Sequence, residues 1–130
     1  MRWRTALAWT WTVAILAVCW FPRSYMPIDE GGRQPFPIPH FDKLVHAGIF
    51  AGFAFLWAGS SPSKGQMAGL IVTGVALAAI SEVGQETRFV NRDASWMDGV
   101  ADVVGLFAGL GLASALGRIG KARTPSAGTP

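Results

Sequence analysis

Four stretches of the chain carry almost no charged side chain, and each is long enough to cross a lipid bilayer. They cover residues 5–22, 44–63, 65–81 and 99–117, and Asp102 is the only Asp, Glu, Lys or Arg within them. A membrane-spanning helix needs about 20 mostly apolar residues, with about 17–25 as the usual range. Buried helices of a small soluble protein would keep a polar stripe, and the centres of these stretches have almost none. The pattern therefore predicts a polytopic membrane protein.

Composition excludes several other classes of protein. Charged residues make up 15% of the 130 residues, against about 25% in soluble domains, and disorder would require high charge with low hydrophobicity. The single cysteine, Cys19, cannot support a disulfide framework. The net charge of +3 is small and spread along the chain, so no nucleic-acid partner is expected.

The predicted fold class is all-α, a four-helix transmembrane bundle. The helices are expected over residues 5–21, 43–59, 66–86 and 98–117, within a transmembrane domain that covers residues 1–117. The first helix is interpreted as retained, because no small-x-small signal-peptide cleavage site follows it. Residues 118–130 are basic and then low in complexity, which is typical of a disordered tail.

The distribution of Lys and Arg near the helix ends predicts the orientation of the bundle. The N-terminus, the second connection and the C-terminal tail hold six of the eleven in short segments. The other five lie in two longer connections that also contain most of the acidic residues. Both termini are therefore expected in the cytoplasm, with the first and third connections outside. The lipid bilayer is then the chain's main partner.

Polar side chains occur at helical spacing near the predicted outer ends of the second, third and fourth helices. The pairs are Asp42 with His46, Glu82 with Gln85, and Asp98 with Asp102. Members of a pair three or four residues apart share one helix face, and ionisable groups inside a membrane are functional hypotheses by default. We expect these side chains to converge with Arg92 into one ligand-binding cluster. Arg92 either compensates Glu82 or Asp98, or is kept for an anionic headgroup of the ligand, which the surplus of carboxylates over this cation favours.

A structural role remains open for several of these residues. Asp42 is a candidate helix N-cap, and Asp98 is an acid in a first helical turn, where the helix dipole favours it. His46 is also compatible with a plain interhelical hydrogen bond. Glu82 and Asp102 are harder to explain structurally, because each lies inside or against an otherwise apolar helix.

Metal binding is a weaker prediction. His46, Glu82, Asp98 and Asp102 are ligand types that suit Zn²⁺, Mn²⁺ or Mg²⁺. However, the chain has no HxxxH or HExxH pair, so no metal and no other cofactor is expected. No nucleophile motif is present either. Enzymatic activity stays uncertain, with acid–base chemistry by His46 and a carboxylate such as Glu82 as its candidate form.

Small residues predict where helices pack closely. The fourth helix carries a stripe made of Asp98, Asp102, Gly105 and Gly109. This stripe should face the bundle interior, while Phe107 and Leu110 should face lipid or other helices, so that truncating Leu110 is expected to be mild. The pairs Gly48 with Gly52 and Gly65 with Gly69 are further small-xxx-small signals.

The ordered polar set resembles the VanZ-like family of small bacterial membrane proteins. The resemblance covers about residues 41–112 and rests on Asp42-Lys43-xx-His46 followed by Phe50 and Phe53, then Ser81-Glu82-xx-Gln85, Arg92, Ser95 and Asp98-xxx-Asp102-xx-Gly105-xxx-Gly109. By this resemblance, the residues that match the family's polar signature are Asp42, Lys43, His46, Glu82, Gln85, Arg92, Asp98 and Gly105. Asp102 departs from the family, in which Asn is usual.

The resemblance implies a helical bundle in the bacterial cytoplasmic membrane. The founding member is associated with low-level resistance to the glycopeptide antibiotic teicoplanin. We therefore expect a binding protein whose outward-facing cluster engages an amphiphilic envelope ligand, either a glycopeptide or a lipid headgroup. The alternatives are a membrane-embedded enzyme acting on an envelope lipid and a structural membrane subunit.

Overall fold

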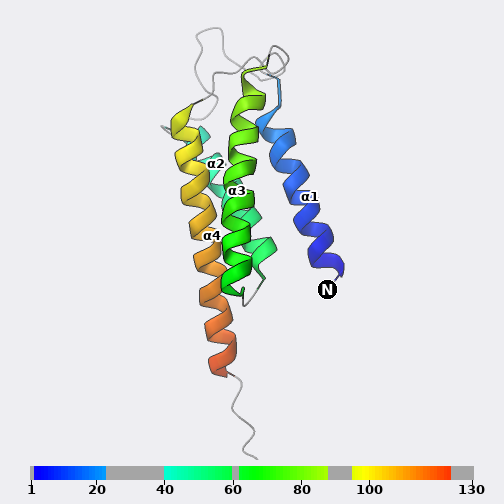
Figure 1. Ribbon diagram of the computed structural model, residues 1–130, viewed down its shortest axis with the longest axis vertical. Helices are drawn as coiled ribbons and strands as arrows, with labels where there is room; N and C mark the ends of the chain where they lie inside the picture. Colours follow the sequence, from blue (N-terminus) through cyan, green and yellow to red (C-terminus); the bar gives the residue numbers. More distant parts are fainter. Residues whose placement is uncertain (1, 23–39, 60–61, 88–94, 124–130) are drawn as a thin grey trace, which may run out of the picture.

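The computed structural model is all-α. It describes residues 2–22, 40–59, 62–87 and 95–123, which form four helices. These are α1 (Arg2–Cys19), α2 (Phe41–Ala58), α3 (Lys64–Gln85) and α4 (Trp96–Arg123). Successive helices run in opposite directions, so α1 and α3 end at the side where α2 and α4 begin (Figure 1). We call this side the cluster end of the bundle, and the opposite side the terminal end.

Three of the helices agree with the predicted bounds to within three residues, but α4 is longer than predicted. It continues to Arg123, so the expectation of a disordered tail was wrong for residues 118–123. No proline interrupts this segment, and basic side chains such as Arg118 and Lys121 are favourable near a helix C-terminus. Residues 124–130 lie outside the described residues.

The entry into α3 is defined by its local sequence. The Ser63 side chain accepts a hydrogen bond from the Gln66 backbone N–H at 3.2 Å, and the Gln66 side chain accepts one from the Ser63 backbone N–H at 3.0 Å. This reciprocal capping box satisfies two backbone donors. Gly59, which follows α2, has φ 64°, a conformation that favours glycine. Both features help the chain to reverse at the terminal end.

The closest helix pair is α2 with α4, and glycines of α4 make the approach possible. A Cβ built on Gly105 would collide with the backbone carbonyl oxygen of Ala47, and one built on Gly109 would collide with that of Ala51. The predicted interior stripe of α4 is therefore confirmed. Small residues of this kind let helix backbones approach closely in membranes.

Other packing predictions were wrong in part. Leu110 is 2% exposed and belongs to the core, so the expectation that its truncation is mild was wrong. It lies one turn from Leu106, whose side chain packs against Gly74 of α3. Phe107 does lie on the exposed side of α4. A Cβ on Gly48, Gly65 or Gly69 would meet nothing within 4 Å, so these glycines do not mark close packing within the described residues.

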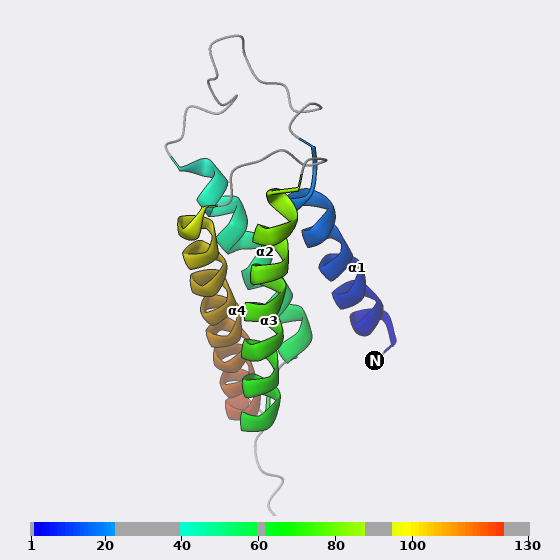
Figure 2. The same ribbon diagram turned by 45° about the horizontal axis from the view of Figure 1, so that its top comes forward.

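Tryptophan side chains attach α1 to α2. Trp11 Nε1 donates a hydrogen bond to the backbone oxygen of Ile49 at 2.8 Å, and Trp57 Nε1 donates one to Thr12 Oγ1 at 3.1 Å. The rings of Trp9 and Trp57 meet edge to face with centroids 5.1 Å apart. Helix α1 stands at the side of the bundle formed by the other three helices (Figure 2).

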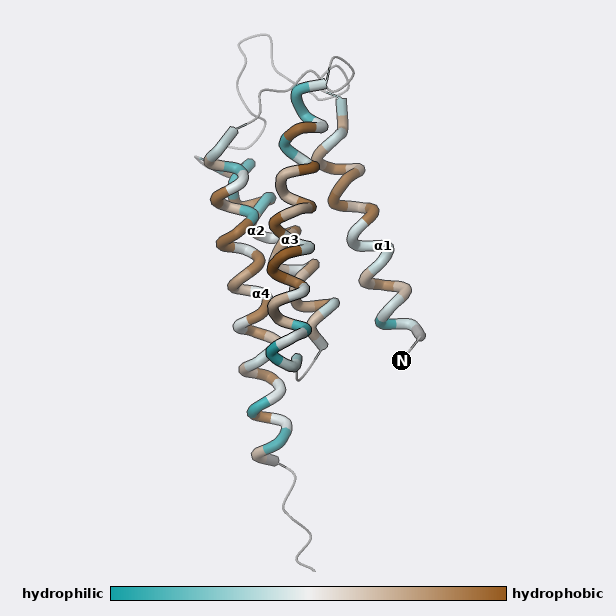
Figure 3. Tube along the Cα trace, in the orientation of Figure 1, coloured by the Kyte–Doolittle hydropathy of each residue, from teal (hydrophilic) through white to brown (hydrophobic). Residues whose placement is uncertain are grey.

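The outer surface of the helices is apolar over most of its height. Hydrophobic residues occupy the middle of the bundle and hydrophilic ones its two ends (Figure 3). Exposed side chains include Val72, Val83, Val104 and Phe107. An apolar surface of this extent marks an environment other than water. Three helices, α2, α3 and α4, are long and apolar enough to cross a membrane, and α1 is apolar but shorter. The chain is thus a multi-pass helical membrane protein.

Candidate functional site

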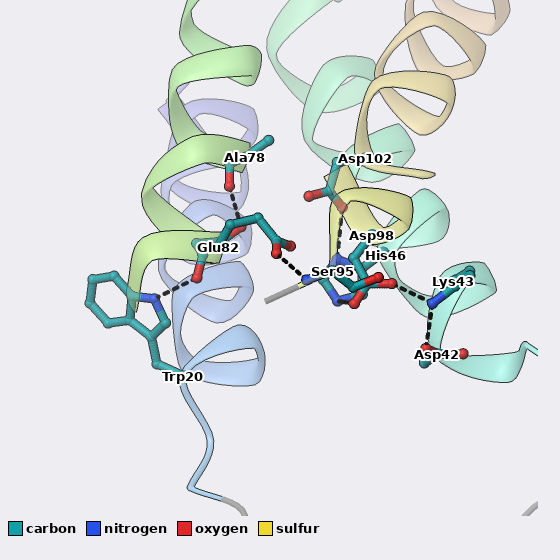
Figure 4. A network of polar contacts seen from close by, with 10 residues as sticks. Trp20, Asp42, Lys43, His46, Ala78, Glu82, Ser95, Asp98 and Asp102 are labelled. Carbon is teal, nitrogen blue, oxygen red and sulfur yellow. Dashed lines mark hydrogen bonds and ion pairs between the residues drawn. The ribbon is translucent and has the colours of Figure 1, made fainter. Parts of the chain in front are cut away.

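A network of polar side chains joins α2, α3 and α4 at the cluster end (Figure 4). All of its ionisable members lie within about two helical turns of the end of their helix. It has two levels. The surface tier consists of Asp42, Lys43 and Asp98, and the deep tier consists of His46, Glu82 and Asp102.

Lys43 organises the surface tier. Its ammonium group lies 2.8 Å from Asp42 Oδ2 and 2.6 Å from Asp98 Oδ1, and so bridges the start of α2 to the start of α4. The Asp98 side chain is 7% exposed, whereas those of Lys43 and Asp42 keep 23% and 29% of their surface. The bridge therefore compensates a carboxylate that has little access to solvent.

The deep tier is centred on His46. Its Nδ1 lies 2.9 Å from Asp102 Oδ1, and its Nε2 lies 3.9 Å from Asp98 Oδ2. The spacing of four residues in α4 places Asp98 and Asp102 one turn apart on the same face. The imidazole ring of α2 thus lies between two carboxylates of α4.

Glu82 brings α3 into the same site. Its Oε2 accepts a hydrogen bond from the Ser95 backbone N–H at 3.0 Å, immediately before α4 begins. One side-chain ligand atom from each of His46, Glu82 and Asp102 lies within 4.8 Å of the others. Three residues from three helices therefore surround one small volume.

Several buried polar atoms of this region have no hydrogen-bond partner among the described residues. They are Glu82 Oε1, Asp102 Oδ2 and Gln85 Nε2. Asp102 and Gln85 are each 1% exposed. An unsatisfied buried polar group costs about 1–3 kcal/mol, and more if it is charged. Such atoms therefore need an explanation in terms of a ligand, an ion or water.

The site is also unbalanced in charge. The two tiers contain four carboxyl groups, and their only basic side chains are Lys43 and His46. Even with His46 protonated, the carboxyl groups in their ionised form exceed the positive charges among the described residues. The arrangement suits a ligand that brings positive charge or hydrogen-bond donors.

The structure brings most of the predicted site residues together. Asp42, His46, Glu82, Asp98 and Asp102 all belong to the network. Arg92 lies outside the described residues, and so does its expected pairing with Glu82 or Asp98.

Gln85 is buried one turn beyond Glu82, although no hydrogen bond from its side-chain amide to another member is described. Asp42 is not the N-cap of α2, since that position is His40. The predicted N-cap role was therefore the wrong structural alternative for Asp42.

Lys43 and Ser95 belong to the set that carries the family resemblance, but the sequence does not predict what they do in the site. Lys43 was expected to belong to the polar signature, but its role as the bridging cation was not, because arginines of the third connection were considered instead. Ser95 acts through its backbone N–H, which no side-chain pattern reveals. The signal for Lys43 was its position three residues before His46, which places both on one face of α2.

A separate apolar groove does not belong to this site. It has a volume of about 350 Å³ and lies on α3 beside Trp20. Its lining residues Ile80, Val83 and Thr87 recur at helical spacing on another face of α3 than Glu82 and Gln85. The groove therefore opens away from the polar network.

Comparison with known proteins leaves the site to be interpreted from its own geometry. No protein-family model, no curated protein and no solved structure matches the chain.

Proposed function

We propose that the protein binds an amphiphilic ligand of the bacterial envelope through the polar network at its cluster end. The observation that carries this proposal is the convergence of six ionisable side chains from three membrane helices, with acids in excess. Ionisable groups within membrane helices are costly and usually mark a functional site. A ligand headgroup with amino or hydroxyl groups would supply the donors that the surplus carboxyl oxygens lack.

The proposed orientation places the cluster end outside the cytoplasmic membrane. The basic residues Arg4, Lys64, Arg118 and Lys121 belong to helix segments at the terminal end. Cytoplasmic segments are enriched in Lys and Arg, so both termini would be cytoplasmic. We include α1 as a fourth membrane span. An envelope ligand would then approach the surface tier from the outer leaflet.

The resemblance to the VanZ-like family adds a specific candidate to this proposal. A glycopeptide such as teicoplanin combines an apolar chain with polar groups that include hydrogen-bond donors. Such a molecule suits a network that lies at the boundary of an apolar bundle. Low-level teicoplanin resistance is accordingly the phenotype to test first.

The test compares a site variant with a matched control. Asp98→Asn removes a charge from the surface tier and keeps the size of the side chain. Glu86→Gln makes the same change at an exposed position just beyond α3. Purified protein in nanodiscs is titrated with teicoplanin and with envelope-lipid extract, and the minimum inhibitory concentration of expressing cells is measured.

We expect saturable binding that falls at least about tenfold in Asp98→Asn, since a tenfold loss corresponds to about 1.4 kcal/mol, the scale of one charge-assisted hydrogen bond. Glu86→Gln should bind as the parent protein does. Equal binding by both variants, or no saturable binding by the parent, would contradict the proposal.

The contact between His46 and Asp102 favours a second candidate, acid–base catalysis on an envelope lipid. A carboxylate on one ring nitrogen orients a histidine and stabilises its protonated form, as in known acid–base pairs. His46→Gln separates the two functions. For an enzyme, a bound lipid would remain bound but would no longer be converted, which thin-layer chromatography of labelled lipid can follow. For a binding protein, no conversion would occur in either form.

A further inference from the structure

The deep tier has the composition and spacing of a metal site. We propose that His46, Glu82 and Asp102 bind one divalent transition-metal ion, of the class of Zn²⁺ or Mn²⁺. The inference goes beyond the binding of an amphiphile, and it departs from the expectation that the sequence alone supports. It rests on the types of the three ligands, the distances between their ligand atoms, the buried oxygens that lack a hydrogen-bond partner, and the residues that surround His46.

The ligand types favour a first-row transition ion over Mg²⁺ or Ca²⁺. One imidazole and two carboxylates form a mixed nitrogen and oxygen set, and imidazole suits zinc and its neighbours, whereas magnesium and calcium prefer oxygen alone. Three protein ligands leave a further coordination position open to water or to a ligand. The three residues come from three different helices, so an ion would tie α2, α3 and α4 together.

The distances are close to those required. Zinc lies about 2.0–2.2 Å from nitrogen and oxygen ligands, so two adjacent ligands of one ion are about 3.0–3.5 Å apart. His46 Nδ1 and Asp102 Oδ1 are 2.9 Å apart, and all three ligand atoms lie within 4.8 Å of one another. A side-chain movement that shortens the longest of these separations would complete the set.

The unsatisfied oxygens give an independent indication. Asp102 is 1% exposed, and its Oδ2 is buried without a hydrogen-bond partner among the described residues, as is Glu82 Oε1. In Figure 4 the carboxyl groups of both residues point toward the space beside the His46 ring. Two carboxyl groups that approach one another with unpaired oxygens repel each other if both are ionised. A divalent cation between them would offset the repulsion and give the unpaired oxygens a partner.

The surface tier places a carboxylate beside the second ring nitrogen of His46, where metal-bound histidines usually have a partner. A ligand histidine typically donates its second ring N–H to a carboxylate, which orients the ring and raises its basicity. Here the carboxylate on the Nε2 side of His46 is Asp98, whose Oδ2 lies 3.9 Å away, within ion-pair distance but longer than a hydrogen bond. Asp98 Oδ1 is held by Lys43 at 2.6 Å. The chain therefore places Asp98 and Lys43 where they would orient His46 for an ion on its Nδ1 side.

The experiment uses the full chain purified in mild detergent, stripped with a chelator and dialysed. Zn²⁺, Mn²⁺ and Mg²⁺ are added separately. The bound metal is counted by mass spectrometry after gel filtration, and affinity is measured by competition with a fluorescent chelator. Asp102→Asn and Glu82→Gln each remove a proposed ligand charge without changing size. Glu86→Gln is the matched control, because it is exposed and lies one turn from Glu82.

We expect one equivalent of Zn²⁺ or Mn²⁺ per chain and much weaker binding of Mg²⁺. Affinity should fall at least about 100-fold in Asp102→Asn and Glu82→Gln, and about 10-fold in Asp98→Asn, the range typical of an outer partner. Thermal stability should rise with metal in the parent protein and in Glu86→Gln, since an ion that binds the folded state stabilises it.

Substoichiometric metal in the parent, or equal loss in Glu86→Gln, would overturn the proposal. The proposal would also be overturned if thermal stability did not respond to metal but fell in Arg92→Gln. That result would indicate that Arg92, and not an ion, neutralises the deep tier. None of these measurements uses an amphiphile, so failure of the metal site leaves the proposed ligand binding to be judged by its own titration.

Discussion

A methyl group added at Gly105 should destabilise the bundle, while the same group added at Gly111, six residues further along α4, should not. In Gly105→Ala the added Cβ would collide with the backbone carbonyl oxygen of Ala47. A backbone oxygen cannot rotate away, so α2 and α4 must move apart. Overpacking costs about 1–3 kcal/mol, and this contact should lie in the upper half of that range.

Gly111→Ala is the matched control, because a Cβ there meets nothing within 4 Å. Both changes gain about 1 kcal/mol of helix propensity, and this gain cancels when the two variants are compared. The difference in free energy of unfolding should therefore be about 2–3 kcal/mol, with Gly105→Ala the less stable. It is measured by titrating the detergent-purified proteins with sodium dodecyl sulfate and following circular dichroism. A difference below about 0.5 kcal/mol, the usual effect of a surface substitution, would refute the packing argument.

Three further predictions concern the ion pair, the core and the topology. Lys43→Gln should lower the free energy of unfolding by about 1–3 kcal/mol, less than for a fully buried pair because Lys43 is part-exposed. Adding Asp98→Asn should restore most of the loss in the same titration. If the effects of the two substitutions were additive, the two side chains would not interact. Leu110→Ala should cost about 2–4 kcal/mol because it leaves a cavity in the core, and a change within 0.5 kcal/mol would place Leu110 at the lipid surface. In a cysteine-free chain, Gly32→Cys should react with a membrane-impermeant thiol reagent on intact cells and Ser63→Cys should not, and the reverse pattern would invert the proposed orientation.

The proposed metal site and the proposed headgroup site occupy different levels of one network. An ion in the deep tier would add two positive charges beneath the surface tier. It would therefore reduce the net negative charge that an approaching headgroup meets. Ligand titrations with and without Zn²⁺ therefore measure whether the two levels are coupled.

Local sequence was sufficient to predict four helices and the faces of their polar pairs, although not the C-terminal end of α4. The absence of charge over about 20 residues predicts a span, because the bilayer fixes the length. The spacing of Asp98 and Asp102 predicts a shared face, because the helix has 3.6 residues per turn. The same periodicity could not separate Leu110 from Phe107, because both are apolar and only packing against the other helices decides which is buried.

Contacts between helices were decided by tertiary structure alone. The sequence places His46, Glu82 and Asp102 on separate segments, and no local rule states which faces meet or at what distance. The close approach of α2 to α4 at Gly105 and Gly109 brings His46 within 2.9 Å of Asp102. The same approach makes Lys43 the partner of Asp98. Local chemistry thus determined which groups enter the membrane. Which of them form ion pairs and hydrogen bonds was determined by backbone packing, because that packing depends on residues far apart in the chain.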